Sequence, residues 1–292
     1  MSIARSLTAL VGVLAVGLTL AGCGVLLPGS VKSPPPAATT KPVVGQCWNA
    51  TTADAADWAD WKGPATAACT SSHTLYTYHV GSISGETGNS WASPSSPDAL
   101  TDQIQTEAED ACSLSTLLPK LAWNQQLING YFFVPTEAQW KAGQRWVRCD
   151  VGVLATGTTL GNESFTALPA KISTLVRQVS SEPVKFEFCM NSSTPVSESG
   201  PLDNRNATLA DCADSPQWRL TTHGNFPDAA GSMFPDDATA NAESSKVCQP
   251  SVKGDNEIWI AYLPTKSDWA SGDREIDCWV GEKSVESGGG TA

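Results

Sequence analysis

The feature that most constrains the fold of this chain is an internal repeat. Residues 131–149 align without a gap on residues 260–278, at a constant offset of 129 positions. Both segments contain the pattern Pro-Thr-x-x-x-Trp-x-x-Gly-x-Arg-x-x-x-Cys. The matched residues are Trp140, Gly143, Arg145 and Cys149 in the first copy and Trp269, Gly272, Arg274 and Cys278 in the second. Solenoid units are shorter, about 20–50 residues, so this period predicts a duplicated domain.

The cysteines divide in the same way. Cys23 stands alone near the N-terminus, and the other eight of the nine cysteines fall into two groups of four. The groups are Cys47, Cys69, Cys112 and Cys149 in the first half and Cys189, Cys212, Cys248 and Cys278 in the second. An even number of cysteines in an exported chain predicts disulfides, two inside each half. Four cysteines allow three connectivities, and the sequence does not choose among them.

Metal binding is the competing interpretation of these cysteines. The sequence has no Cys-x-x-Cys pair and only three histidines, His73, His79 and His223. Zinc sites built on cysteine use closely spaced ligands of this kind. The sequence therefore predicts neither a metal site nor a cofactor.

Each half has the same expected order of elements, β-β-α-β-β. Period-two alternation and turn residues predict strands over 45–48, 74–83, 130–134 and 145–154, and over 185–190, 218–226, 257–263 and 274–281. Pro97-Asp98 opens one helix, which brings Cys112 to its buried face, and Pro235-Asp236 opens the other. A short helix is expected over 171–178. The fold class is therefore α+β, with two tandem related domains, each a small disulfide-stapled antiparallel sheet with one helix.

The N-terminus has the pattern of a lipoprotein signal peptide. Arg5 precedes an apolar run over residues 7–20, which ends at Leu20-Ala21-Gly22-Cys23. An uncleaved transmembrane anchor is the alternative, but about 14 apolar residues fall short of the ~20 that a spanning helix needs. We therefore expect cleavage after residue 22 and lipidation of Cys23, which anchors the chain to the outer face of the cytoplasmic membrane.

The remaining boundaries follow from composition. Residues 23–44 form a proline-rich tether, 45–160 the first domain, 161–183 a linker, 184–282 the second domain and 283–292 a disordered tail. The chain has 18 basic and 30 acidic side chains, a formal net charge of −12. This charge argues against nucleic acid as a partner.

The repeated motif has two interpretations. A Trp-Arg pair could grip a ligand, or it could fix the corner of a hairpin, with Gly143 and Gly272 supplying the positive φ that ends a helical turn. Because both halves keep the pattern while sharing little else, we favour a structural corner.

Three residues of the first half are candidates for binding a partner. Trp58 and Trp61 lie in a segment with acidic neighbours, where indole rings could stack on sugars, although most tryptophans pack inside folds. His73 is the third candidate, and its alternative role is a hydrogen bond to nearby backbone.

Gly81 to Gly85 resembles a nucleophile elbow but has Ile83 at its centre, so it lacks the Gly-x-Ser-x-Gly pattern. No catalytic residue is predicted.

Several of these patterns together resemble a known family. Gly-x-Cys at 45–47, Cys-x-x-x-His at 69–73, the helix cysteine and the closing motif are similar to the septum-formation family of actinobacterial extracytoplasmic proteins. Residues 185–282 resemble a second, diverged copy. The resemblance implies a link to cell division. We therefore expect a non-catalytic binding or scaffold module of the cell envelope, with cell-wall or division proteins as partners; the alternative is an enzyme acting on peptidoglycan or another envelope polymer.

The lipoprotein interpretation is tested by replacing the anchor residue. Cys23→Ala should abolish labelling by radioactive palmitate and stop processing at that site, because the thiol that carries the lipid is gone. Ser30→Ala, in the tether, is the matched control and should label normally. A labelled Cys23→Ala variant would show that the lipid is attached elsewhere or not through this signal.

Overall fold

The computed structural model describes residues 41–58, 61, 63–84, 97–192, 207–227, 233–270 and 272–282, with only the backbone of 97–102. The predicted signal peptide, Cys23, most of the tether and the C-terminal tail lie outside these residues. The described part of the chain has no helix that is both long enough and apolar enough to cross a bilayer.

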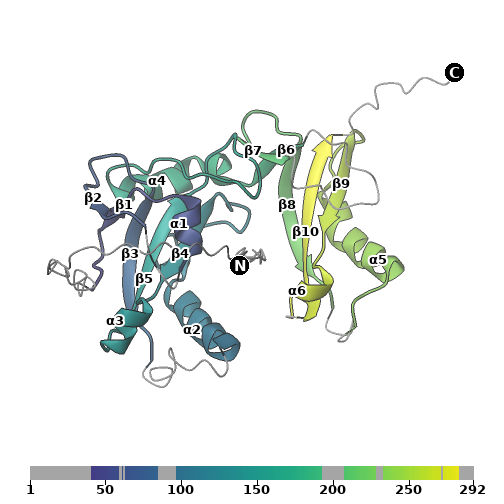
Figure 1. Ribbon diagram of the computed structural model, residues 1–292. Coiled ribbons are helices and arrows are strands. Elements are labelled where there is room, and N and C mark those ends of the chain that lie inside the picture. The colour runs from purple at the N-terminus through teal and green to yellow at the C-terminus, as the bar shows by residue number, and fades with distance from the viewer. Residues whose placement is uncertain are drawn as a thin grey trace, which may run out of the picture.

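Two five-stranded antiparallel sheets form the framework of the molecule (Figure 1). The first has the order β2-β1-β3-β5-β4 and the second the order β7-β6-β8-β10-β9. The first sheet consists of β1 (Cys47–Trp48), β2 (Thr66–Ala67), β3 (Leu75–Ser82), β4 (Ile128–Phe133) and β5 (Trp146–Val153). The second consists of β6 (Cys189–Ser192), β7 (Ala207–Ala210), β8 (Trp218–Asn225), β9 (Glu257–Tyr262) and β10 (Glu275–Glu282). The predicted α+β class with two tandem sheet domains is confirmed.

Four of the six α-helices of the described residues occupy matching places in the two halves. The six are α1 (Thr52–Ala56), α2 (Pro97–Ala111), α3 (Glu137–Lys141), α4 (Ile172–Ser181), α5 (Asp237–Cys248) and α6 (Lys266–Ala270). The matching pairs are α2 with α5 and α3 with α6. Helices α2 and α5 follow the third strand of their sheets, as predicted, and α3 and α6 lie in the repeated motif. Helix α4 extends the short helix expected over 171–178 by three residues.

The prediction of four strands and one helix in each half was incomplete. The edge strands β2 and β7 were missed, as was α1, whereas the helical turns expected in the repeated motif are present as α3 and α6. Strand β2 has only two residues, which are too few to show the alternating pattern of a strand. It pairs with β1 through Cys47↔Ala67 and Trp48↔Thr66. The first strand of the second half begins at Cys189 and not at residue 185, because a 3-10 turn over Pro183–Phe186 precedes it.

The duplication extends to a shared irregularity in strand register. In the first half Thr77 pairs with Asp150 and His79 with Cys149, so Tyr78 bulges out. In the second half Leu220 pairs with Trp279 and Thr222 with Cys278, which leaves the intervening residue as the bulge. A β-bulge at the same place in both sheets is a feature of the ancestral fold and not of one copy. The predicted correspondence of Cys149 with Cys278 is confirmed.

All eight remaining cysteines form disulfides inside their own half. The pairs are Cys47–Cys69, Cys112–Cys149, Cys189–Cys212 and Cys248–Cys278. Of the three connectivities open to each half, both use the one that joins first to second and third to fourth. The first bridge of each half ties the first strand to the residues after the short edge strand, and the second ties a helix end to the last strand of the half, β5 or β10.

The repeated motif is a corner that joins two strands. Thr136 caps α3 in a capping box with Gln139, and Gly143 ends the turn at φ +86°. The Arg145 guanidinium lies 3.9 Å from the ring centre of Trp140 and donates a 2.8 Å hydrogen bond to its backbone carbonyl. Trp140 is buried.

The second corner repeats this arrangement. Thr265 and Asp268 exchange capping hydrogen bonds, and Gly272 has a φ of +94°. Arg274 lies 3.7 Å from the ring centre of the buried Trp269 and donates 2.7 Å to its carbonyl. Both arginines are thus engaged by the corner itself, which favours the structural interpretation of the motif over ligand binding.

The two halves are joined by strand pairing as well as by the chain. The N–H of Gly157 donates to the carbonyl of Leu209 at 2.7 Å, and the N–H of Leu209 donates to Thr158 at 2.8 Å. Leu160 likewise donates to Ala207 at 2.9 Å. Residues 157–160 therefore extend the edge of the second sheet at β7. Helix α4, in the expected linker, packs Leu175 and Val179 into the same hydrophobic cluster as residues of both sheets.

The disulfide pattern is tested by peptide mapping of the unreduced protein. We expect four bridged peptides with the pairs given above and no bridge between the halves. Each bridge closes a loop of 22 to 37 residues, and its loss should lower the free energy of unfolding by about 3–4 kcal/mol. A bridge such as Cys149 to Cys212 would contradict the independent folding of two copies.

Candidate functional site

Strand β5, which lies between β3 and β4 in the first sheet, has two differently used faces. Side chains alternate along a strand, so neighbours of a residue that faces one way face the other. Cys149 faces α2, because its disulfide partner Cys112 directly follows that helix. Arg148 and Asp150 therefore point to the opposite face, where they lie buried.

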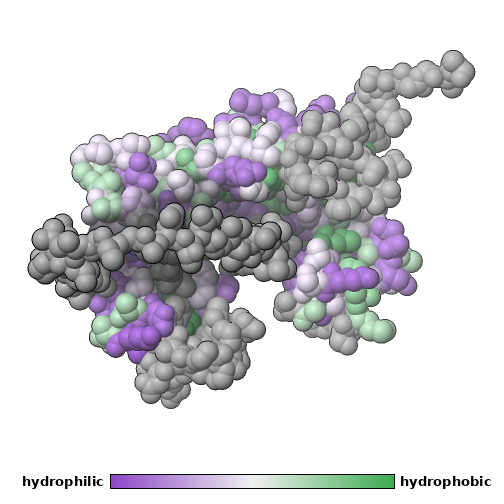
Figure 2. All heavy atoms as spheres, in the orientation of Figure 1, coloured by the Kyte–Doolittle hydropathy of each residue, from purple (hydrophilic) through white to green (hydrophobic). Residues whose placement is uncertain are grey.

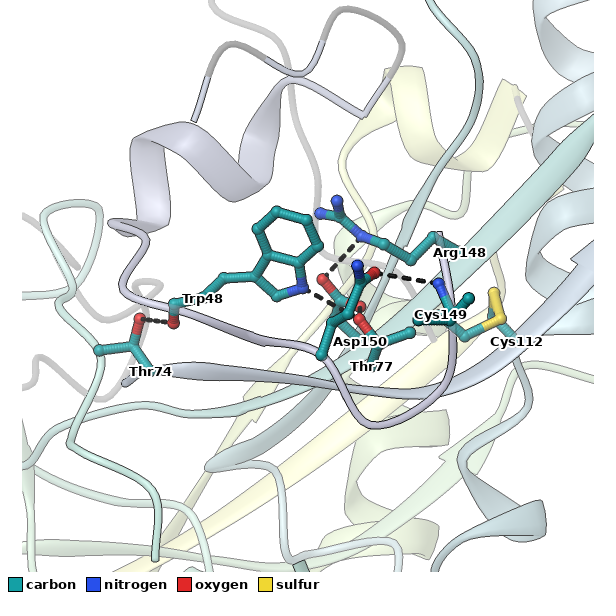
Figure 3. A network of polar contacts seen from close by, with 9 residues as sticks. Trp48, Thr74, Thr77, Cys112, Arg148, Cys149 and Asp150 are labelled. Carbon is teal, nitrogen blue, oxygen red and sulfur yellow. Dashed lines mark hydrogen bonds and ion pairs between the residues drawn. A yellow bond between two sulfur atoms is a disulfide. The ribbon is translucent and has the colours of Figure 1, made fainter. Parts of the chain in front are cut away.

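A polar network connects four buried side chains on this face (Figure 3). Asp150 Oδ2 lies 3.0 Å from Arg148 Nε, and Asp150 Oδ1 accepts a 2.7 Å hydrogen bond from the Thr77 hydroxyl. The same hydroxyl oxygen accepts a 2.9 Å hydrogen bond from the Trp48 indole N–H. The bulge after Thr77 places its side chain directly opposite Asp150 in the β3–β5 register.

Three aromatic rings surround the guanidinium of Arg148. Its central carbon lies 4.1 Å from the ring centre of Trp48, 4.3 Å from that of Trp61 and 4.1 Å from that of Phe133. Cation–π contacts of this kind strengthen when water is excluded. Arg148 is only 2% exposed. The rings thus take the place of water around the charge.

Burial also sets the protonation chemistry of the pair. It raises the pKa of Asp150 to about 6, against the opposing effects of the Arg148 charge and of the hydrogen bonds from Thr77 and Arg148. A carboxyl group with such a pKa is typical of general acids and bases. Here, however, the side chain is fully buried and offers no access to a substrate. The arrangement therefore acts as an internal charge pair.

The two tryptophans predicted to bind a partner, Trp58 and Trp61, both pack against residues of the first sheet. Trp61 covers Arg148 and meets Phe133 edge-to-face at 4.6 Å between ring centres. Trp58 is half-buried against Phe132 at 5.2 Å, and its carbonyl accepts the Val134 N–H at 3.0 Å. Both tryptophans are partly exposed, and each ring packs against a phenylalanine of β4.

His73 lies inside the first half. It is 1% exposed, and its Nδ1 lies 2.9 Å from the carbonyl oxygen of Ser71. This contact is the backbone hydrogen bond of the alternative interpretation. A partner would not reach His73 in this structure, so the residue does not lie on a binding surface.

The second half replaces the polar network with apolar side chains. By the shared register, Met190, Leu220 and Trp279 stand where the first half has Trp48, Thr77 and Asp150. These three residues belong to one hydrophobic cluster. The buried charge pair is therefore specific to the first half and is not needed to specify the fold.

This polar network was not predicted from the sequence, although the positions of Arg148 and Asp150 beside Cys149 pointed to it. Arg148 and Asp150 flank Cys149 of the repeated motif, and a cysteine that faces a helix requires its neighbours to face the other way. The second copy has Asp277 and Trp279 at these positions, so identity between the copies did not point to them.

A shallow, open depression of about 270 Å³ lies beside the first corner. Its lining residues are Lys41, Ser82, Gln144, Arg145 and Trp146. The lining contains no carboxylate and no imidazole, so this depression does not bring together an acid and a base.

The charge pair predicts an unequal response to two substitutions. Asp150→Asn leaves the Arg148 charge buried without a counter-charge and should lower the free energy of unfolding by about 3–5 kcal/mol. Glu137→Gln, which breaks an exposed pair with Lys141, is the control and should cost less than about 1 kcal/mol. Denaturant unfolding with the disulfides intact measures both. Equal losses would show that the pair does not stabilise the fold.

The second variant of the pair, Arg148→Met, should have a free energy of unfolding that depends on pH. Without the arginine, the pKa of the buried Asp150 stays above its value in the unfolded chain, so the folded state binds a proton more readily than the unfolded state. The free energy of unfolding of this variant should therefore fall as pH rises from 5 to 8. Asp150→Asn should lack this component of the pH dependence, because it has no carboxyl group at that position.

Comparison with known proteins adds one match. A family model described as septum formation matches residues 44–278. The match runs through both sheets and includes all four disulfides. No curated protein and no solved structure matches the chain. Because the family model covers well over half of its length, the chain belongs to the septum formation family.

Proposed function

We propose that this chain is a membrane-anchored extracytoplasmic lipoprotein that acts as a non-catalytic binding or scaffold module of the cell envelope. Its family links it to septum formation. In this proposal a lipid on Cys23 holds the two sheets at the outer face of the cytoplasmic membrane. Proteins of the wall or of the division machinery are the partners.

Two features support the anchor and its compartment. Leu20-Ala21-Gly22-Cys23 is a lipobox, and a proline-rich tether separates it from the first strand. The four disulfides suit an oxidising environment outside the cytosol.

The junction between the halves is the observation that carries the scaffold role. Residues 157–160 pair with β7, and the N–H of Phe188 donates 2.9 Å to the carbonyl of Asn124. The Trp123 ring of the first half stacks on His223 of the second, with 4.5 Å between ring centres and 4° between the planes. Backbone and ring contacts thus hold the two sheets in one fixed relation, which suits a module that presents two surfaces at a set spacing.

The burial of the reactive groups supports a non-catalytic role. Asp150 and His73 are shielded from solvent, and the eight cysteines of the described residues are oxidised, so none of them can act as a thiolate nucleophile. Figure 2 shows hydrophilic and hydrophobic residues interspersed over the coloured part of the visible face. A partner that binds this face would meet a mixed surface.

Photo-crosslinking in living cells tests the binding role. A photoreactive residue at Met233, which is 80% exposed, samples the second half, and one at Lys141, whose side chain is 59% exposed, samples the first. We expect at least one position to capture division or wall-synthesis proteins. A photoreactive residue at the buried Leu127 is the control and should capture none.

The same protein should be inactive as a hydrolase. The purified chain is incubated with isolated peptidoglycan, and the release of soluble fragments is followed. Cleavage that disappears on substitution of a single carboxylate would establish the enzyme alternative and overturn the proposal.

A further inference from the structure

The second half brings together three side chains that can ligate a metal. His223 on β8 lies directly opposite Asp277 on β10, and Glu275 precedes Asp277 by two residues on the same face of the strand. One ligand atom from each of the three residues lies within 4.8 Å of the other two. The cluster is therefore a product of strand pairing between residues more than 50 positions apart in the chain.

The imidazole of this cluster is held in place from two sides. Trp123 stacks on the His223 ring in a parallel arrangement. His223 Nδ1 lies 2.9 Å from Glu275 Oε1. The His223 side chain is nevertheless 44% exposed, so an ion from solution can reach it. A ring fixed in orientation but open to solvent suits metal binding.

The cluster holds two carboxylates, and no Lys or Arg of the described residues forms an ion pair with either of them. Asp277 Oδ1 is buried without a hydrogen-bond partner. Burial, and after it the charge of Glu275, raises the pKa of Asp277. The first half has Arg148 at the position of Asp277, where it neutralises a neighbouring carboxylate. The second copy has thus exchanged a buried cation for an anion, which leaves two carboxylates that a bound cation would neutralise.

We propose that His223, Glu275 and Asp277 form a binding site for a divalent transition-metal ion, and that Zn²⁺ is the ion that fits the ligands best. Imidazole favours Zn²⁺ over Mg²⁺ and Ca²⁺, and carboxylate oxygens of Asp and Glu are also ligands that Zn²⁺ accepts. Three protein ligands leave a coordination position for water or for a group of a partner. The inference does not depend on the proposed scaffold role.

The geometry requires only a small adjustment. Ligands about 2 Å from a tetrahedral ion lie roughly 3.3 Å apart, and no two of the three ligand atoms are more than 4.8 Å apart, so no pair has to approach by more than about 1.5 Å. Side-chain rotation of the two carboxylates provides this movement. The sequence predicted no metal site because the cysteine and histidine spacings showed none, and pairing of β8 with β10 creates this one.

Calorimetric titration of the full chain with Zn²⁺, after removal of metal by a chelator, tests the site. We expect one equivalent to bind and to raise the midpoint temperature of unfolding, whereas Mg²⁺ at the same concentration leaves it unchanged. His223→Gln and Asp277→Asn should each weaken Zn²⁺ binding at least about tenfold. His79→Gln, a histidine at a neighbouring register position of the first half, is the matched control and should bind as tightly as the unaltered chain.

The outcomes are distinct. Failure to bind Zn²⁺, or binding that His223→Gln and Asp277→Asn leave unchanged, overturns the site. Circular dichroism confirms that each variant is folded, and Glu275→Gln supplies the same comparison if His223→Gln unfolds. Loss of the site would leave the scaffold proposal intact, because that proposal is tested by crosslinking.

Discussion

The disulfide between a helix end and an interior strand of the sheet is the constraint on which the rest of each half depends. Cys149 and Cys278 lie in β5 and β10, between two other strands, and their bridges pull α2 and α5 onto one face of the sheet. Alternation along the strand then sends the flanking residues to the other face. The position of the cysteine therefore decides where charge can be placed, because the helix-covered face has to be apolar.

The two copies show how far chemistry can diverge on a fixed frame. Both keep the corner, the bulge and the disulfide pattern, which set the backbone. On the face opposite the helix, the first copy buries Arg148 with Asp150 beneath aromatic rings, while the second has Asp277 and Trp279 at the same places. Replacing a buried ion pair with apolar residues is often neutral for stability. At the position of Arg148 the second copy has a carboxylate, Asp277, which lies opposite His223.

The sequence predicted the parts of the fold that repeat or have a period. Trp140, Gly143 and Arg145 stood out because Trp269, Gly272 and Arg274 match them, and the longer strands and helices showed their periods. Strands β2 and β7 did not, since two to four residues held by a disulfide and one pairing neighbour need no hydrophobic pattern. The degree of burial of Trp61 and His73 was also beyond reach, because burial depends on residues distant in the chain.

The junction explains why the two sheets form more than a pair of linked domains. On its own, the second sheet would leave backbone groups of its edge strand β7 unpaired on one side, and such edges tend to recruit other chains. Residues 157–160 pair with that edge, so the end of the first half closes the second sheet. The same contact brings Trp123 over His223. A change in the relative position of the halves would therefore separate the two rings, and the chemistry of the second sheet depends on the first half being in place.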